Sequence, residues 1–111
     1  MGTSIDSTLA ALADPTRRRV VDLLREQPRP AGELAAAIPM SPPAMSRHLR
    51  VLRLGGLIEE EHGGVDARLR VYRLRPRPFQ ELRRWAENIE AFWADQLESF
   101  RKHAERKEKR P

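Results

Sequence analysis

The sequence contains no cysteine among its 111 residues. This absence excludes disulfide bridges, thiolate metal ligands and redox sensing through thiols. No apolar run approaches the roughly 20 residues that a membrane-spanning helix needs. The amino terminus also lacks the basic segment and apolar run of a signal peptide. We therefore expect a soluble cytoplasmic protein without a membrane partner.

Signatures of catalysis and of metal binding are missing as well. The sequence shows no glycine-rich phosphate loop, no recognisable Ser-His-Asp set and no carboxylate pair placed in an apolar cleft. Its three histidines, His48, His62 and His103, are far apart, and no two of them share a helix at ligand spacing. We expect no enzymatic activity, no cofactor and no metal site.

Positive charge, in contrast, is in excess. Lysine and arginine number 21 against 16 acidic residues, which gives a formal net charge of +5. This balance suits a polyanionic partner such as double-stranded DNA, although many basic proteins bind nothing acidic. The length predicts one domain over residues 1–111, and a domain of this size often gains stability by dimerising.

Helix-start signals are clear at two places. Asp14 and Ser41 each precede a proline, and proline fits the first position of a helix, so both residues are predicted N-caps. Thr3 or Ser4 is a plausible cap for an earlier helix. The predicted helices cover about residues 4–13, 15–27, 31–38, 42–54 and 79–107.

One stretch between the helices changes character. Residues 57–75 mix apolar side chains with charged ones on both sides of a turn at residues 63–66, which predicts a two-stranded hairpin. Gly55-Gly56 ends the helix before it, and Pro76 and Pro78 stop the returning strand. The fold class is therefore mainly α with a small β-hairpin, in the order of a winged helix-turn-helix.

The fourth predicted helix has two different faces. Met45, Leu49 and Leu52 are spaced to be buried, together with Leu34, Ala35 and Ile38 of the preceding helix. The other face is polar, as in a helix that enters the major groove of DNA, although a solvated helix face can look the same. The residues predicted to contact DNA on and beside this helix are Ser41, Pro43, Ser46, Arg47, His48 and Arg50.

Arginines also crowd the hairpin. Arg68 and Arg70 lie nearest its tip and are predicted to grip phosphates or the minor groove beside the recognition helix. Two alternatives stay open. The arginines could protect an edge strand from aggregation, or they could pair with Glu59, Glu60 and Glu61.

The last helix carries a long apolar stripe that includes both tryptophans and all three phenylalanines. At 1.5 Å per residue the helix would span roughly 40 Å, which is more than one small domain can cover. We predict a homodimer interface made with the first helix, and the alternative is a surface for a different protein. The predicted interface residues are Ile5, Leu9, Leu82, Ala86, Ile89, Phe92, Trp93 and Leu97.

The chain resembles the arsenic-repressor-like (ArsR) family from about residue 8 to residue 93. The resemblance rests on five segments in the family's order, which are residues 14–18 (DPTRR), 32–35 (GELA), 41–52 (SPPAMSRHLRVL), 56–58 (GLI) and 72–74 (YRL). It implies a dimeric repressor that binds a palindromic operator and releases it on sensing a signal, often a metal.

The sequence departs from this family pattern at two places. Pro42 stands where the family usually has glutamine, so one potential base contact is missing. Leu34-Ala35-Ala36-Ala37 stands where the family places metal-binding cysteines. On the last helix, Asp95 is followed by Leu97 instead of a histidine, and His103 stands alone. We therefore expect a sequence-specific repressor that senses no metal, and the sequence does not identify any small-molecule effector.

Overall fold

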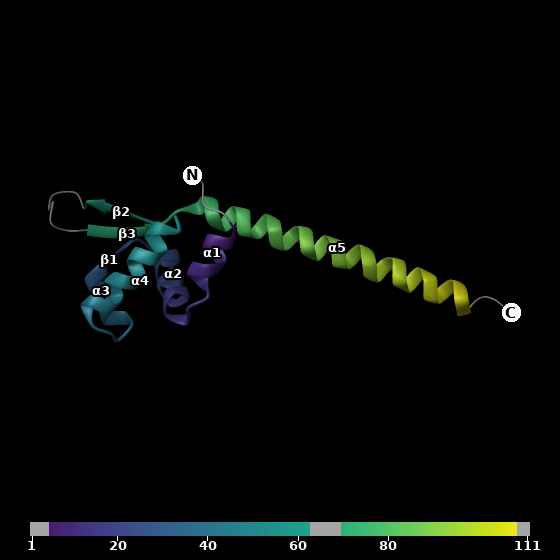
Figure 1. Ribbon diagram of the computed structural model, residues 1–111, viewed down its shortest axis with the longest axis horizontal. Helices are drawn as coiled ribbons and strands as arrows, with labels where there is room; N and C mark the ends of the chain where they lie inside the picture. Colours follow the sequence, from purple (N-terminus) through teal and green to yellow (C-terminus); the bar gives the residue numbers. More distant parts are fainter. Residues whose placement is uncertain (1–4, 63–69, 109–111) are drawn as a thin grey trace. The chain divides into compact units, whose positions relative to one another are not determined.

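The computed structural model describes residues 5–62 and 70–108 (Figure 1). Within these residues the chain forms five helices and three short strands. In chain order they are α1 (Ile5–Leu12), α2 (Pro15–Glu26), β1 (Arg29–Pro30), α3 (Ala31–Ala37), α4 (Pro42–Leu54), β2 (Ile58–His62), β3 (Arg70–Leu74) and α5 (Pro76–Glu108). This order confirms the winged helix-turn-helix. The caps predicted at Thr3 or Ser4 and the turn at residues 63–66 lie outside the described residues.

Both predicted N-caps are present. One carboxylate oxygen of Asp14 accepts hydrogen bonds from the backbone N–H of Thr16, at 2.8 Å, and of Arg17, at 3.1 Å. The bond from Arg17 is the main reason that the pKa of Asp14 is lowered from its usual value. The hydroxyl of Ser41 accepts from the backbone N–H of Ala44 at 3.3 Å. These bonds satisfy donors that a helix start otherwise leaves unpaired.

The core is built where α1, α2, α3, α4 and the start of β2 meet. The apolar side chains buried there are Ala11, Val20, Leu24, Leu34, Ile38, Met45, Leu49, Leu52, Leu57 and Ile58. The burial predicted for Leu34, Ile38, Met45, Leu49 and Leu52 is confirmed, while Ala35 is only partly buried. Helix α4 is thereby anchored along the face that carries Met45, Leu49 and Leu52.

The sheet has three strands where a two-stranded hairpin was predicted. Its order is β1-β3-β2, all antiparallel, with Tyr72 paired to Arg29 on one side and to Glu60 on the other. Sequence reasoning does not find β1, because a two-residue strand carries no alternation and because prolines such as Pro28 and Pro30 are typical of a helix end. Pro30 is tolerated because β1 is an edge strand.

Two glycines connect α4 to the sheet. Gly55 is the C-cap of α4, and Gly56 follows it with a φ of 78°. Residues with a side chain rarely adopt this left-handed conformation, which glycine adopts readily. The chain then enters β2 through Leu57, which is fully buried. This turn fixes where the wing, residues 57–75, leaves the recognition helix.

Helix α5 begins at Pro76, three residues before the predicted start at Phe79. Prolines at positions 76 and 78 end the strand and also fit the first turn of a helix, where their missing N–H groups need no partner. Contacts divide the chain into two units, residues 1–80 and residues 81–111. None of the described helices is both long and apolar enough to cross a bilayer.

We expect Leu52→Ala to lower the free energy of unfolding by about 2–5 kcal/mol, because it leaves a cavity in a filled core. Leu52 is 0% exposed, whereas Leu54, on the same helix, is 73% exposed. Leu54→Ala is therefore the matched control, with an expected change within about 0.5 kcal/mol. Urea denaturation of both variants measures the difference, and equal effects would contradict the buried face assigned to α4.

Candidate nucleic-acid interface

The exposed face of α4 carries most of the predicted DNA contacts. Pro43, Ser46, Arg47 and Arg50 are exposed on the helix, and Ser41 is exposed at its N-cap. The guanidinium of Arg47 makes a long hydrogen bond to the carbonyl of Pro43, at 3.4 Å. Arg50 has no side-chain partner within residues 5–62 and 70–108. Both arginines therefore lie on an anchored helix with donors available to a ligand.

His48 lies on the flank of α4, partly buried, and differs from its arginine neighbours. Its Nδ1 is 3.5 Å from a guanidinium nitrogen of Arg17 in α2. The same guanidinium donates to the carbonyls of Ala11, at 2.6 Å, and Ala10, at 3.3 Å, near the end of α1. His48 thus takes part in a contact between α2 and α4. The only sign of this contact in the sequence is the position of His48 at the border between the buried and exposed faces of α4.

In the described part of the wing, arginines of β3 form ion pairs with glutamates of β2. Arg70 lies 3.1 Å from Glu60, and Glu60 also accepts from Arg53 of α4 at 2.8 Å. Arg73 pairs with Glu59 at 2.6 Å and with Glu61 at 3.0 Å. The alternative of pairing with glutamates is therefore realised for Arg70, although this side chain is still 63% exposed. The other predicted wing contact, Arg68, lies outside the described residues.

Burial also affects the pKa of Tyr72, on β3 of the sheet. The phenol of Tyr72 is partly buried beside Glu60, and burial is the main reason that its pKa is raised from the usual value, with the negative charge of Glu60 as the next. Tyr72 therefore stays neutral at physiological pH. It packs against the core from β3 and supports the wing without contributing charge.

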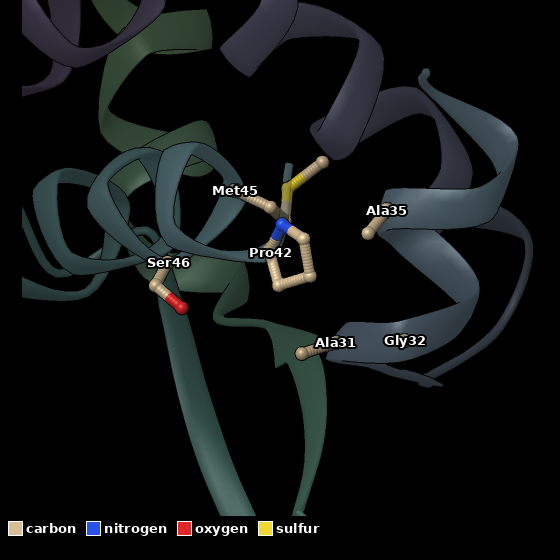
Figure 2. Close-up of a pocket in the computed structure, with 6 residues that line it drawn as sticks. All are labelled: Ala31, Gly32, Ala35, Pro42, Met45 and Ser46. Carbon is tan, nitrogen blue, oxygen red and sulfur yellow. The ribbon is translucent and has the colours of Figure 1, made fainter. Parts of the chain in front are cut away.

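A pocket opens between the two helices of the helix-turn-helix, and sequence reasoning did not foresee it (Figure 2). Its volume is about 180 Å³, and its walls come from both helices. Met45 is buried, while Gly32, Pro42 and Ser46 are exposed. The only available signal was the cluster of small residues on α3. The lining residues are Ala31, Gly32, Ala35, Pro42, Met45 and Ser46.

Helix α5 leaves its apolar stripe uncovered in the described chain. Phe92 is 58% exposed, Trp93 59% and Leu97 66%, and the rings of Phe92 and Trp93 meet edge to face with centroids 6.1 Å apart. Ile89 and Ala86 are also exposed, and Leu82 is partly buried. On α1, Leu9 is exposed and Ile5 partly buried. The predicted interface residues are thus available for a partner.

Metal-ligating side chains are scattered. No group of three or more histidine, aspartate or glutamate side chains in residues 5–62 and 70–108 is arranged to hold a metal ion. On α3, Leu34 is buried in the core and Ala35 lines the pocket, so both positions carry apolar side chains.

Comparison with known proteins agrees with this arrangement. A family model described as a helix-turn-helix domain matches residues 12–61, from the end of α1 into β2. The HTH-type transcriptional regulator Rv2034 of Mycobacterium tuberculosis is 38% identical over 97 residues, which cover 87% of this chain and 85% of that protein. The transcriptional repressor SdpR of Bacillus subtilis is 33% identical over 60 residues, covering 54% of this chain and 67% of that protein.

Solved structures show the same likeness. An ArsR-like transcriptional regulator from Rhodococcus sp. RHA1 superposes with a TM-score of 0.75 at 30% identity, covering 90% of this chain and 92% of that one. The homodimeric winged helix-turn-helix DNA-binding domain of Mb0332 from Mycobacterium bovis gives a TM-score of 0.59 at 25% identity, covering 86% and 82%. Sequence and structure together establish that the chain belongs to the ArsR-like family of winged helix-turn-helix transcriptional regulators.

Proposed function

We propose that this regulator is a cytoplasmic repressor that binds an inverted-repeat DNA site as a homodimer, with α4 of each protomer in the major groove. The observation that carries the proposal is the exposed pair Arg47 and Arg50 on a helix whose opposite face is fully anchored. Arginine reads guanine through a bidentate hydrogen bond or clamps a phosphate. Arg68 and Arg70 of the wing are proposed to add backbone contacts.

Repression follows from simple occupation of the DNA. The two recognition helices of a dimer would enter successive major grooves about 34 Å apart, and RNA polymerase cannot bind a promoter that overlaps the occupied site. The name of the Bacillus subtilis relative as a repressor supports this direction of regulation. An enzymatic role receives no support from the site, because the exposed face offers arginine and serine without an adjacent base.

The proposed homodimer rests on the exposed apolar surface of α5. Burying a large aromatic side chain contributes roughly 1.5–3 kcal/mol, so Phe92 and Trp93 are costly to leave in water. Ion pairs such as Arg83–Glu87, at 2.7 Å, lie beside the stripe and leave it free for a second copy. The homodimeric state of the Mycobacterium bovis domain supports a second copy as the partner over an unrelated protein.

The first test of the proposal concerns Arg47 and Arg50. We expect Arg47→Ala and Arg50→Ala each to weaken binding to duplexes that the protein selects from a random pool, by about 1–3 kcal/mol at matched salt. Arg84→Ala removes the same charge from α5 and is the control, with little expected effect. Fluorescence anisotropy measures all three, and arginine variants that bind like wild type would exclude α4 from the interface.

Dimerisation is tested on α5. The double variant Phe92→Ala with Trp93→Ala removes the two largest side chains in the middle of the stripe, so we expect it to sediment as a monomer at micromolar concentration. Because a lone domain makes only half the DNA contacts, it should bind the operator weakly at physiological salt, and its affinity should depend less steeply on salt than that of the dimer. Asn88→Ala, exposed on the same helix, should remain dimeric. A monomeric wild-type protein with full operator affinity would refute this interface.

Insensitivity to metals is a further expectation, since the sequence has no cysteine and the described residues form no ligand cluster. Operator affinity should be the same, within error, with micromolar zinc, with arsenite, with hydrogen peroxide or with a chelator. Electrophoretic mobility shifts under each condition measure this. Release of DNA by zinc that is reversed by chelator would show that a metal site exists after all.

A further inference from the structure

The pocket between α3 and α4 adjoins the face that the proposed function assigns to DNA. Ser46 lines this pocket and also lies on the exposed side of α4, one position before Arg47. Pro42 lines it at the first turn of α4, and the first turns of a recognition helix are the part that meets base edges in a major groove. The opening is therefore continuous with the proposed DNA-reading surface.

The chemistry of the lining is apolar. Figure 2 shows the ring of Pro42 and the side chain of Met45 between Ser46 on one side and Ala31 and Ala35 on the other. Proline has no N–H and no polar side-chain atom, so Pro42 cannot hydrogen-bond a base edge. Among the lining side chains, only the hydroxyl of Ser46 can donate a hydrogen bond. Such a pocket selects an apolar group that carries a polar edge beside it.

One group in the major groove fits this description. Thymine presents a C5-methyl group there, next to its O4 acceptor, and no other standard base carries a methyl group. We propose that the pocket of Ala31, Ala35, Pro42 and Met45 receives the methyl group of a thymine in each operator half-site, with the Ser46 hydroxyl donating to the adjacent O4. This inference rests on the proposed DNA binding and adds a base preference to it.

The space available agrees with this occupant. The pocket, of about 180 Å³, is larger than a methyl group, so the edge of the ring can enter with it. At Gly32 an added Cβ would have no atom within 4 Å, which means that the wall on the α3 side is open. A side chain introduced at Gly32 would therefore occupy space at this wall without disturbing the core.

The test replaces thymine by uracil, which removes only the methyl group. Duplexes are first selected from a random pool by the wild-type protein, and each thymine of the half-site is then replaced in turn. We expect one position per half-site to lose affinity by about fourfold, as one buried methyl group predicts, and about 15-fold when both half-sites are changed. The remaining thymines should tolerate uracil.

A pair of protein variants locates the effect. Gly32→Leu fills the open wall and should bind thymine and uracil duplexes equally, while Ala36→Leu, on an exposed position of α3 outside the pocket, should keep the wild-type discrimination. If Gly32→Leu binds neither duplex, Gly32→Ala replaces it, with a discrimination expected below that of wild type. Thermal unfolding of each variant verifies that the fold is retained.

The outcomes separate this inference from the proposed function. A protein that selects no sequence at all would overturn the DNA-binding proposal itself. A protein that selects an operator but tolerates uracil at every position, or whose half-site contains no thymine on either strand, overturns only the methyl pocket. Discrimination that persists unchanged in Gly32→Leu would place methyl recognition elsewhere on the interface and would equally overturn the pocket.

Discussion

The burial of one face of α4 is the constraint on which the rest of the structure depends. Met45, Leu49 and Leu52 belong to the core cluster, and their helix contacts α2, α3 and β2. A helix held along about two turns cannot rotate about its axis without exposing these side chains. The positions of Arg47 and Arg50 on the exposed face are therefore set by the burial of side chains on the opposite face of the same helix.

A second constraint acts where three helices meet. The guanidinium of Arg17 donates to carbonyls at the end of α1, lies 4.0 Å from the carboxylate of the α2 N-cap, Asp14, and reaches His48 on α4. This side chain is only 17% exposed, so its charge is satisfied mainly by these groups. The arrangement links α1, which the proposed dimer uses, to the recognition helix.

The elements that the sequence predicted are those with local causes. Asp14-Pro15 and Ser41-Pro42 combine an N-cap with a proline, and Gly56 permits a left-handed turn, so the bounds of α2 and α4 could be predicted closely. Strand β1 could not be predicted, because its two residues pair only once β3 has been placed beside them. The pocket is likewise a product of packing, since its walls come from two helices whose separation no local pattern specifies.

The ion pairs on the wing show why net charge alone does not locate a DNA-binding surface. The net charge of +5 suggests a broadly basic surface, yet Glu59, Glu60 and Glu61 face Arg70 and Arg73 across the hairpin. A phosphate that approaches Arg70 must compete with Glu60, so Arg70 exchanges one ion pair for another and gains little free energy. Arg50 has no such competitor among the described residues. In the proposed complex, Arg50 therefore offers a phosphate or a base edge an unpaired guanidinium on the helix proposed to read the bases, so binding strength and sequence preference would share this helix.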